Sequence, residues 1–95
     1  MTTKKYLGTI TILVKDRHAN SPDVNRVLSE QGNLVMARLG VNVQPLCASN
    51  CHGLITVAVQ GTAKEINELT KKLDSLYGIV AKSLIITISI ILCQF

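Results

Sequence analysis

Aromatic side chains are scarce in this sequence, which has no Trp, two Tyr and one Phe among its 95 residues. Proteins that bind single-stranded nucleic acid by stacking need aromatic side chains beside their basic ones. The net charge of +4 therefore does not by itself predict nucleic-acid binding. Apolar runs are also short, because none reaches the roughly 18–20 residues of a membrane-spanning helix. The sequence predicts no membrane segment.

Cysteine and catalytic motifs are limited as well. The three cysteines are an odd number, which argues against a disulfide framework and favours a reducing, cytoplasmic location. The sequence contains no glycine-rich phosphate loop, no nucleophile elbow and no HExxH pair. We therefore expect that the protein is not an enzyme. A small enzyme or an accessory protein of cofactor assembly is the least favoured alternative.

The sequence is rich in Leu, Ile and Val, and they follow two regular spacings. Hydrophobic residues make up 47% of the chain, which is too many for a disordered protein. Alternation with a period of two, typical of strands, covers residues 7–15, 34–43 and 54–60 and a run that begins at Ile79. Spacing of three and four, typical of helices, covers residues 22–32 and 62–78.

Local signals mark where both helices begin. Pro22 suits the first position of the first helix, with Ser21 as its N-cap after a polar turn. Thr62 and Glu65 have the spacing of a capping box at the start of the second helix. In such a box each side chain accepts a hydrogen bond from the backbone N–H of the other residue.

The order strand, helix, strand, strand, helix, strand predicts an α+β fold. This order is that of the ferredoxin-like βαββαβ two-layer sandwich, an antiparallel four-stranded sheet with two helices on one face. The first and third strands are expected at its centre. The whole chain, 1–95, is expected to form one domain, with a core at about 6–87 and an apolar C-terminal strand extension at 88–95.

Two groups of polar residues are candidates for contact with a ligand or a partner subunit. Residues 16–18 follow the first strand, where functional loops are common; a turn with a local ion pair is the alternative explanation. Arg38 and Asn42 lie on the second strand, on what we expect to be the non-helical face of the sheet. Gly40 between them allows a ligand or another backbone to approach closely.

Cysteine and histidine cluster in the segment between the two middle strands. Cys47, Cys51 and His52 are soft-metal ligands within six residues, a set that suits nickel, zinc, copper or iron. The spacing is not CxxC, and a closed tetrahedral site needs a fourth ligand, from His18 or from a neighbouring chain. The alternatives are a redox-responsive loop and an ordinary exposed loop that carries thiols.

Several short motifs recur in a known order along the chain. In the first half they are Asp16-Arg17, Val24-Asn25, Leu28, Gly32 and Arg38-Leu-Gly40. In the second half they are Gly61-Thr62, Glu65-Ile66, Leu69-Thr70, Lys72-Leu73, Leu76, Gly78, Val80 and Lys82-Ser83. Together these motifs resemble those of the iron-only hydrogenase system regulator family. The resemblance covers about residues 6–87.

The resemblance implies a ferredoxin-like fold similar to ACT domains and to the C-terminal domain of the nickel-responsive repressor. It also implies a small oligomeric regulatory or ligand-sensing module, a transcriptional or metabolic regulator. In ACT-like assemblies ligands bind at subunit interfaces near the loop after the first strand. By that analogy the ligand-binding residues are Asp16, Arg17, Asn25 and Arg38.

The nickel-responsive repressor also differs from this sequence in two respects. It binds DNA through an N-terminal ribbon-helix-helix, whereas about five residues precede the first strand here, so we expect no direct DNA binding. Its metal ligands, mostly His with one Cys, lie on and just after the second strand. Cys47, Cys51 and His52 follow the same strand in a different pattern, so only the location of the site carries over. The sequence does not identify a cofactor, and a transition metal ion is the candidate that these residues raise.

The C-terminal run carries much of the apolar excess. If residues 79–95 formed one strand, Leu84, Ile86 and Ile88 would line one face and leave an exposed apolar edge. We predict that this strand and the sheet edges pair with another subunit in a homodimer or homotetramer. A small-molecule or metal effector and a protein partner complete the expected interactions.

Overall fold

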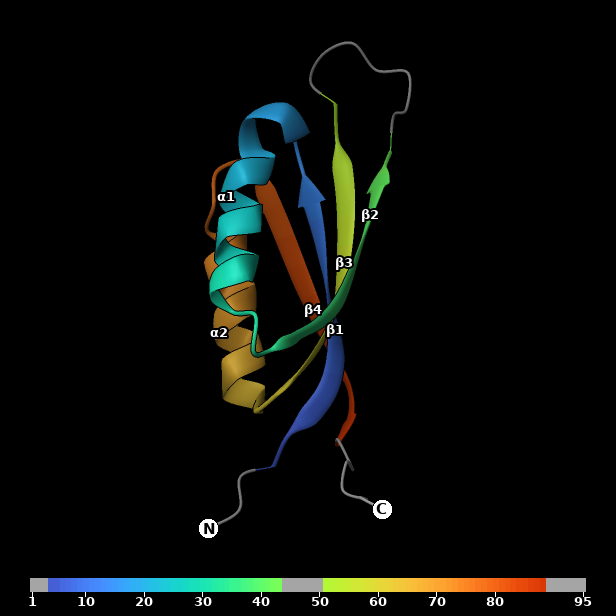
Figure 1. Ribbon diagram of the computed structural model, residues 1–95, viewed down its shortest axis with the longest axis vertical. Helices are drawn as coiled ribbons and strands as arrows, with labels where there is room; N and C mark the ends of the chain where they lie inside the picture. Colours follow the sequence, from blue (N-terminus) through green and yellow to red (C-terminus); the bar gives the residue numbers. More distant parts are fainter. Residues whose placement is uncertain (1–3, 44–50, 89–95) are drawn as a thin grey trace.

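The computed structural model describes residues 4–43 and 51–88 of the chain. Its elements are β1 (Tyr6–Val14), α1 (Arg17–Glu30), β2 (Val35–Asn42), β3 (Gly53–Gly61), α2 (Ala63–Asp74) and β4 (Ile79–Ile88). The four strands form one antiparallel sheet in the order β2-β3-β1-β4. Figure 1 shows both helices on one side of this sheet. The predicted ferredoxin-like sandwich, with the first and third strands in the centre, is confirmed.

The hydrophobic core lies between the sheet and the two helices. Alternate residues of the central strands face the helices, because the side-chain period of a strand is two. The buried strand and helix residues include Ile10, Ile12, Val14, Val24, Val27, Leu28, Ile55, Val57, Val59, Ile66, Leu69 and Leu73. Within each strand and helix these buried residues follow the spacings of two, and of three and four, that the sequence shows. Neither helix of the described ranges is long and apolar enough to cross a membrane.

The start of α2 is the one that the sequence predicts. The Thr62 Oγ1 accepts a 3.1 Å hydrogen bond from the Glu65 N–H, and the Glu65 Oε1 accepts a 2.9 Å hydrogen bond from the Thr62 N–H. The backbone hydrogen bond from Thr62, helped by its side chain and by the charge of Lys5, lowers the pKa of Glu65 below its ordinary value of 4.5, while burial opposes the shift. At the other end of α2, the Asp74 Oδ1 accepts a 2.9 Å hydrogen bond from the Ala81 N–H.

The start of α1 is five residues earlier than predicted. Its first residue is Arg17, and the preceding Asp16 has a left-handed backbone (φ 50°) and makes no side-chain cap. The Asp16 carbonyl accepts a 3.1 Å hydrogen bond from the Asn20 N–H, so a helical turn already precedes Pro22. A tertiary hydrogen bond from the Arg17 N–H to the Cys51 carbonyl (2.7 Å) fixes this start. The predicted start at Pro22 is therefore wrong, because that residue lies inside the helix.

The face that β2 turns toward the helices is the opposite of the predicted one. A register shift after Val35 leaves Met36 as an extra residue, a β-bulge. One extra residue reverses the direction of every side chain that follows. Arg38 therefore pairs with the buried, helix-facing Val57, whereas Leu39 is 68% exposed on the other face. The prediction that Arg38 lies on the non-helical face is wrong.

A second bulge lies where β4 pairs with β1. The register shifts beside Gly8, and Ile86 is the extra residue of β4. A Cβ at Gly8 would lie 2.5 Å from the carbonyl oxygen of Leu84, so a larger residue would force the two strands apart. Residues 89–95, on which the predicted extension of β4 depends, lie outside the described ranges.

Candidate functional site

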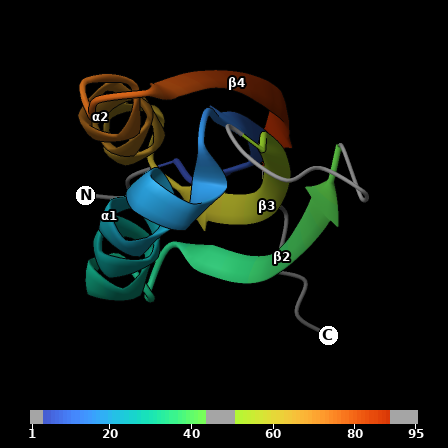
Figure 2. The ribbon, with the colours of Figure 1, turned by 90° about the horizontal axis from the view of Figure 1, so that it is seen from above.

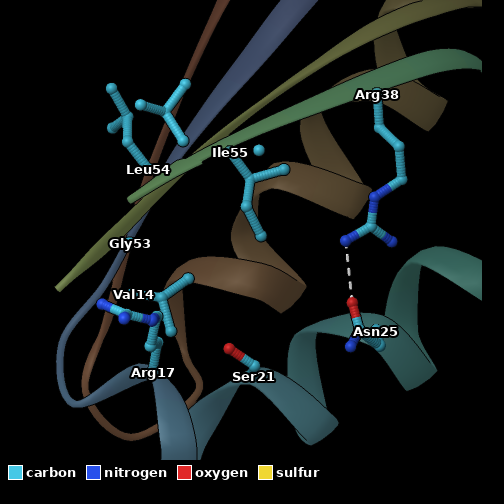
Figure 3. A pocket seen from close by; sticks show the side chains of 10 residues that line it. Val14, Arg17, Ser21, Asn25, Arg38, Gly53, Leu54 and Ile55 are labelled. Atoms are coloured by element: carbon cyan, nitrogen blue, oxygen red, sulfur yellow. Dashed lines mark hydrogen bonds between the residues drawn. The ribbon is translucent and has the colours of Figure 1, made fainter. Parts of the chain in front are cut away.

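A cavity of about 290 Å³ opens between α1, β2 and β3, on the helical side of the sheet. Seen from above, α2 lies beside β4, while α1 lies nearer β2 (Figure 2). The residues that line the cavity are Val14, Arg17, Ser21, Asn25, Arg38, Gly40, Val41, Gly53, Leu54 and Ile55. Figure 3 shows Ser21 and Asn25 on the helix that forms one wall and Ile55 pointing in from the sheet.

Arg38 reaches from β2 to α1 at one end of the cavity (Figure 3). Its Nη2 donates a 2.8 Å hydrogen bond to the Oδ1 of Asn25. A guanidinium group has five N–H donors, so further donors are available to a ligand beside the amide nitrogen of Asn25. Ser21 lies one helical turn before Asn25 and adds a hydroxyl group to the same wall.

Arg17 holds the other end of the cavity together. Its N–H donates to the carbonyl of Cys51 (2.7 Å), and its Nη1 donates to the carbonyl of His52 (3.2 Å). The side chain also rests on the start of β3, since a Cβ built at Gly53 would lie 3.5 Å from the Arg17 Cδ. These contacts fix the first turn of α1 against β3, at the helix end where the macrodipole is positive.

The cavity is positively charged and has no acidic lining residue. Arg17 and Arg38 are its two ionisable lining residues. The ion pairs of the described ranges lie elsewhere: Arg26 with Asp23 and Glu30, Lys64 with Glu68, and Lys72 with Glu30. Within those ranges, neither cavity arginine has a carboxylate partner. A guanidinium without a counterion favours an anion such as a carboxylate or a phosphate.

The structure brings together three of the four residues that the resemblance implied as ligand-binding. Arg17, Asn25 and Arg38 line the cavity. Asp16 does not, because it lies beyond the start of α1 and lines a separate hollow of about 380 Å³ beside Tyr77. That the three gathered residues bind a ligand stays a prediction.

Ser21 adds a polar group to the lining that the sequence analysis did not predict. Arg17, Ser21 and Asn25 are four residues apart and form one polar stripe along α1. The stripe is visible in the sequence, but a helix that starts at Pro22 leaves out its first two members. Gly40 lies opposite on β2, and a Cβ built there would meet no atom within 4 Å. The missing side chain therefore leaves space in the cavity.

The predicted metal site of Cys47, Cys51 and His52 stays a prediction, because only Cys51 and His52 lie in the described ranges. Cys47 lies outside the described residues, and the His52 carbonyl is a partner of α1. Cys51 is fully buried and disulfide-bonded, against the expectation drawn from the odd cysteine count, because three cysteines still allow one pair. A thiolate is the metal ligand, so a disulfide sulfur does not serve. In residues 4–43 and 51–88 no group of three His, Cys, Asp or Glu side chains is placed to hold a metal ion.

A comparison with known protein families shows which family the chain belongs to. Residues 6–83 match the TM1266-like family, described as "Iron-only hydrogenase system regulator, putative". The chain belongs to this family. The match runs from the start of β1 into β4, so the whole cavity lies within the family region. The predicted family is confirmed.

Solved structures of low sequence identity share the fold. The uncharacterized protein TM1266 from Thermotoga maritima matches with a TM-score of 0.77 at 23% identity, over 87% of this chain and 99% of that one. The ACT domain from GTP pyrophosphokinase of Chlorobium tepidum matches with a TM-score of 0.65 at 15% identity, over 84% and 86%. The ACT-like fold is thereby confirmed, while likeness to the nickel-responsive repressor stays a prediction. No curated protein sequence matches the chain.

Proposed function

We propose that this chain is a non-enzymatic, ligand-sensing regulatory module that binds a small anion in the cavity between α1, β2 and β3. The observation that carries the proposal is the pair of arginines, Arg17 and Arg38, around a cavity without a carboxylate. Guanidinium groups form short, charge-assisted hydrogen bonds with carboxylates and phosphates. The regulator family and the ACT-like fold support a sensing role.

The lining side chains favour binding over catalysis. General acid–base catalysis most often uses His, Asp or Glu side chains, whereas the charged side chains of this lining are two arginines. Ser21 is the one hydroxyl in the lining, and no His, Asp or Glu among the lining residues of the described ranges could activate it as a nucleophile. The cavity is therefore proposed to hold its ligand unchanged.

Isothermal titration with small anions tests the proposal. Suitable probes are inorganic phosphate, succinate and a neutral amide analogue of succinate. We expect at least one anion to bind, and the Arg38→Gln variant to bind it about 10-fold or more weakly, because a hydrogen bond to a charged group is worth roughly 1.5–3 kcal/mol. The neutral analogue should not bind measurably.

A matched variant separates the cavity from general positive charge. Lys82→Gln removes the same charge from β4, where Lys82 is exposed on the face away from the helices. Its anion affinity should remain within about 2-fold of the unmodified chain, since exposed charges are screened within roughly 10 Å at moderate salt. An equal loss in Lys82→Gln and Arg38→Gln would contradict a specific site.

The proposal includes action as a cytoplasmic homo-oligomer that signals through a protein partner, without binding DNA directly. The sheet order leaves one side of β2 and one side of β4 without a strand partner in the described ranges. Such edges offer N–H and carbonyl groups to another chain. The predicted assembly through the sheet edges and the C-terminal strand rests on this property and on residues outside the described ranges.

A redox-responsive or metal-binding loop of Cys47, Cys51 and His52 is the second candidate, because Cys51 is disulfide-bonded. Dithiothreitol would reduce this bond to two thiols and so create potential metal ligands. Native mass spectrometry of the reduced chain with added zinc or nickel tests the idea, with Cys51→Ser as the comparison. Stoichiometric metal in the reduced chain, but not in the Cys51→Ser variant, supports the metal-binding candidate. The absence of bound metal in both proteins contradicts the metal-binding version.

A further inference from the structure

The face of the sheet away from the helices is apolar, although an antiparallel sheet usually exposes a polar face to water. By register, its residues alternate with the buried ones along each strand. Its apolar members are Leu7, Leu13, Ala37, Leu39, Val41, Leu54, Ala58, Val80 and Leu84. Its polar members are Thr9, Thr11, Thr56, Gln60, Lys82 and Thr87. We call this set the open face; it contains one charged residue.

We propose that the open face binds the open face of a second copy of this chain, sheet against sheet, in a symmetric dimer. The first argument is area. The strands are 8 to 10 residues long, so four of them cover about 19 Å by 30 Å, roughly 570 Å². Two such faces in contact remove at least about 1,100 Å² from water, close to the lower limit of about 1,200 Å² for stable interfaces.

The second argument is shape. A symmetric contact joins the same patch of both copies, so a protrusion needs a matching hollow on the same face. Leu39 is 68% exposed and provides the protrusion. Beside it the small side chains of Thr9, Ala37 and Ala58 leave a shallow hollow of about 210 Å³. The apolar side chain of a leucine from the second copy can fill this hollow.

The third argument is polarity. Near a two-fold axis a residue meets its own copy, and like charges there would repel each other. The middle strands β1 and β3 carry threonines, Thr11 and Thr56, whose hydroxyls both donate and accept hydrogen bonds. The one charge, Lys82, lies on the edge strand β4. A membrane surface would instead call for a cluster of basic residues, which the open face lacks.

This surface deepens the proposed homo-oligomer, because it assigns the contact to the open face rather than to the sheet edges. It does not use the polar groups of the anion cavity, which lie on the helical side of the sheet, although Val41 and Leu54 border both surfaces. A dimer contact at the open face also explains why leucines are exposed there on the monomer, since large apolar patches on a monomer mark interaction sites.

Sedimentation velocity at about 1–100 µM chain, a range that spans weak to moderate interfaces, tests the surface. The test variant combines Leu39→Glu with Leu84→Glu, two residues that are 68% and 61% exposed, so the folded chain tolerates the change. The matched control is Tyr77→Glu, a residue that is 88% exposed after α2 and away from the open face. We expect a dimer for the unmodified chain and the control, and a dissociation constant at least about 100-fold higher for the double variant.

Two outcomes overturn the proposal, and they are distinguishable. A monomer at every concentration removes both the open-face dimer and the proposed homo-oligomer. If the double variant still forms the dimer, the open face is not the contact surface, but the proposed homo-oligomer stands. If deletion of residues 89–95 then abolishes that dimer, the contact lies in the C-terminal segment. Circular dichroism confirms that each variant is folded. Anion titration of the double variant checks that the cavity is unaffected.

Discussion

The two βαβ halves of the sheet have the same topology, but their helices are specified in different ways. In the second half α2 has a complete capping box, an acidic residue in its first turn and two basic residues, Lys71 and Lys72, in its last. In the first half α1 has no side-chain cap, no such charges at its ends and Pro22 in its interior. Both helices bury three side chains against the core.

The difference between the two helices indicates where the proposed binding site lies. α2 carries its own start signal in the sequence and packs against β4 and β3. α1 depends on tertiary hydrogen bonds from Arg17 to residues 51 and 52, and its polar stripe faces the cavity rather than the core. Places where local rules are weak are often functional sites. The first half therefore supplies the polar side chains of the proposed binding site, while β3 of the second half supplies part of its apolar wall.

The largest expected effect comes from the core of the second half. Ile66 is a fully buried residue of α2, so Ile66→Ala should lower the free energy of unfolding by about 2–5 kcal/mol, because it leaves a cavity. Urea unfolding measures this change. Asn67→Ala, at the next and exposed position of α2, should change stability by less than about 0.5 kcal/mol.

A smaller loss is expected from the capping box. Thr62→Ala removes the acceptor of the Glu65 N–H and should lower the free energy of unfolding by about 1 kcal/mol at neutral pH. Urea unfolding at neutral pH gives the value. An unchanged stability would mean that the core alone specifies α2, and the contrast between the two helices would be lost.

The capping box also predicts a pH dependence. Because the folded pKa of Glu65 lies below the ordinary value of 4.5, its charge stabilises the fold above that value. The contribution is lost as the pH falls through the lowered folded pKa. Glu65→Gln should therefore be less stable than the unmodified chain at neutral pH, and the difference should vanish once the pH falls below the lowered folded pKa of Glu65. A difference that persists at low pH would show that the charge is not its cause.

The smallest change in stability, together with a clear loss of anion binding, is expected from Gly40→Val. A Cβ at this position meets no atom within 4 Å, and valine is favoured in strands. The variant should keep its free energy of unfolding within about 0.5 kcal/mol while its new methyl groups fill the cavity. Anion titration should then show at least about 10-fold weaker binding, since a filled cavity excludes the ligand. Unchanged anion affinity would show that the anion binds outside this cavity.

Most of the fold could be predicted from the sequence, because strand and helix periods and the capping box are local signals. The start of α1 could not, because the hydrogen bond from Arg17 to Cys51 joins residues far apart in the chain. The candidate site was predicted in part: the resemblance pointed to Arg17, Asn25 and Arg38, but the alternation of β2 placed Arg38 on the wrong face. A single extra residue, Met36, reversed that face.

By itself the sequence determined the order of the elements, the core positions and the family, since each depends on residue types at short spacings. Only the tertiary structure decided which side of the sheet each β2 residue occupies. It thereby placed Arg38 over Asn25 on the helical side and exposed Leu39 on the other. The physical reason is that a strand has a period of two, so one bulge exchanges its faces. The same bulge thus formed both the proposed anion site and the open face.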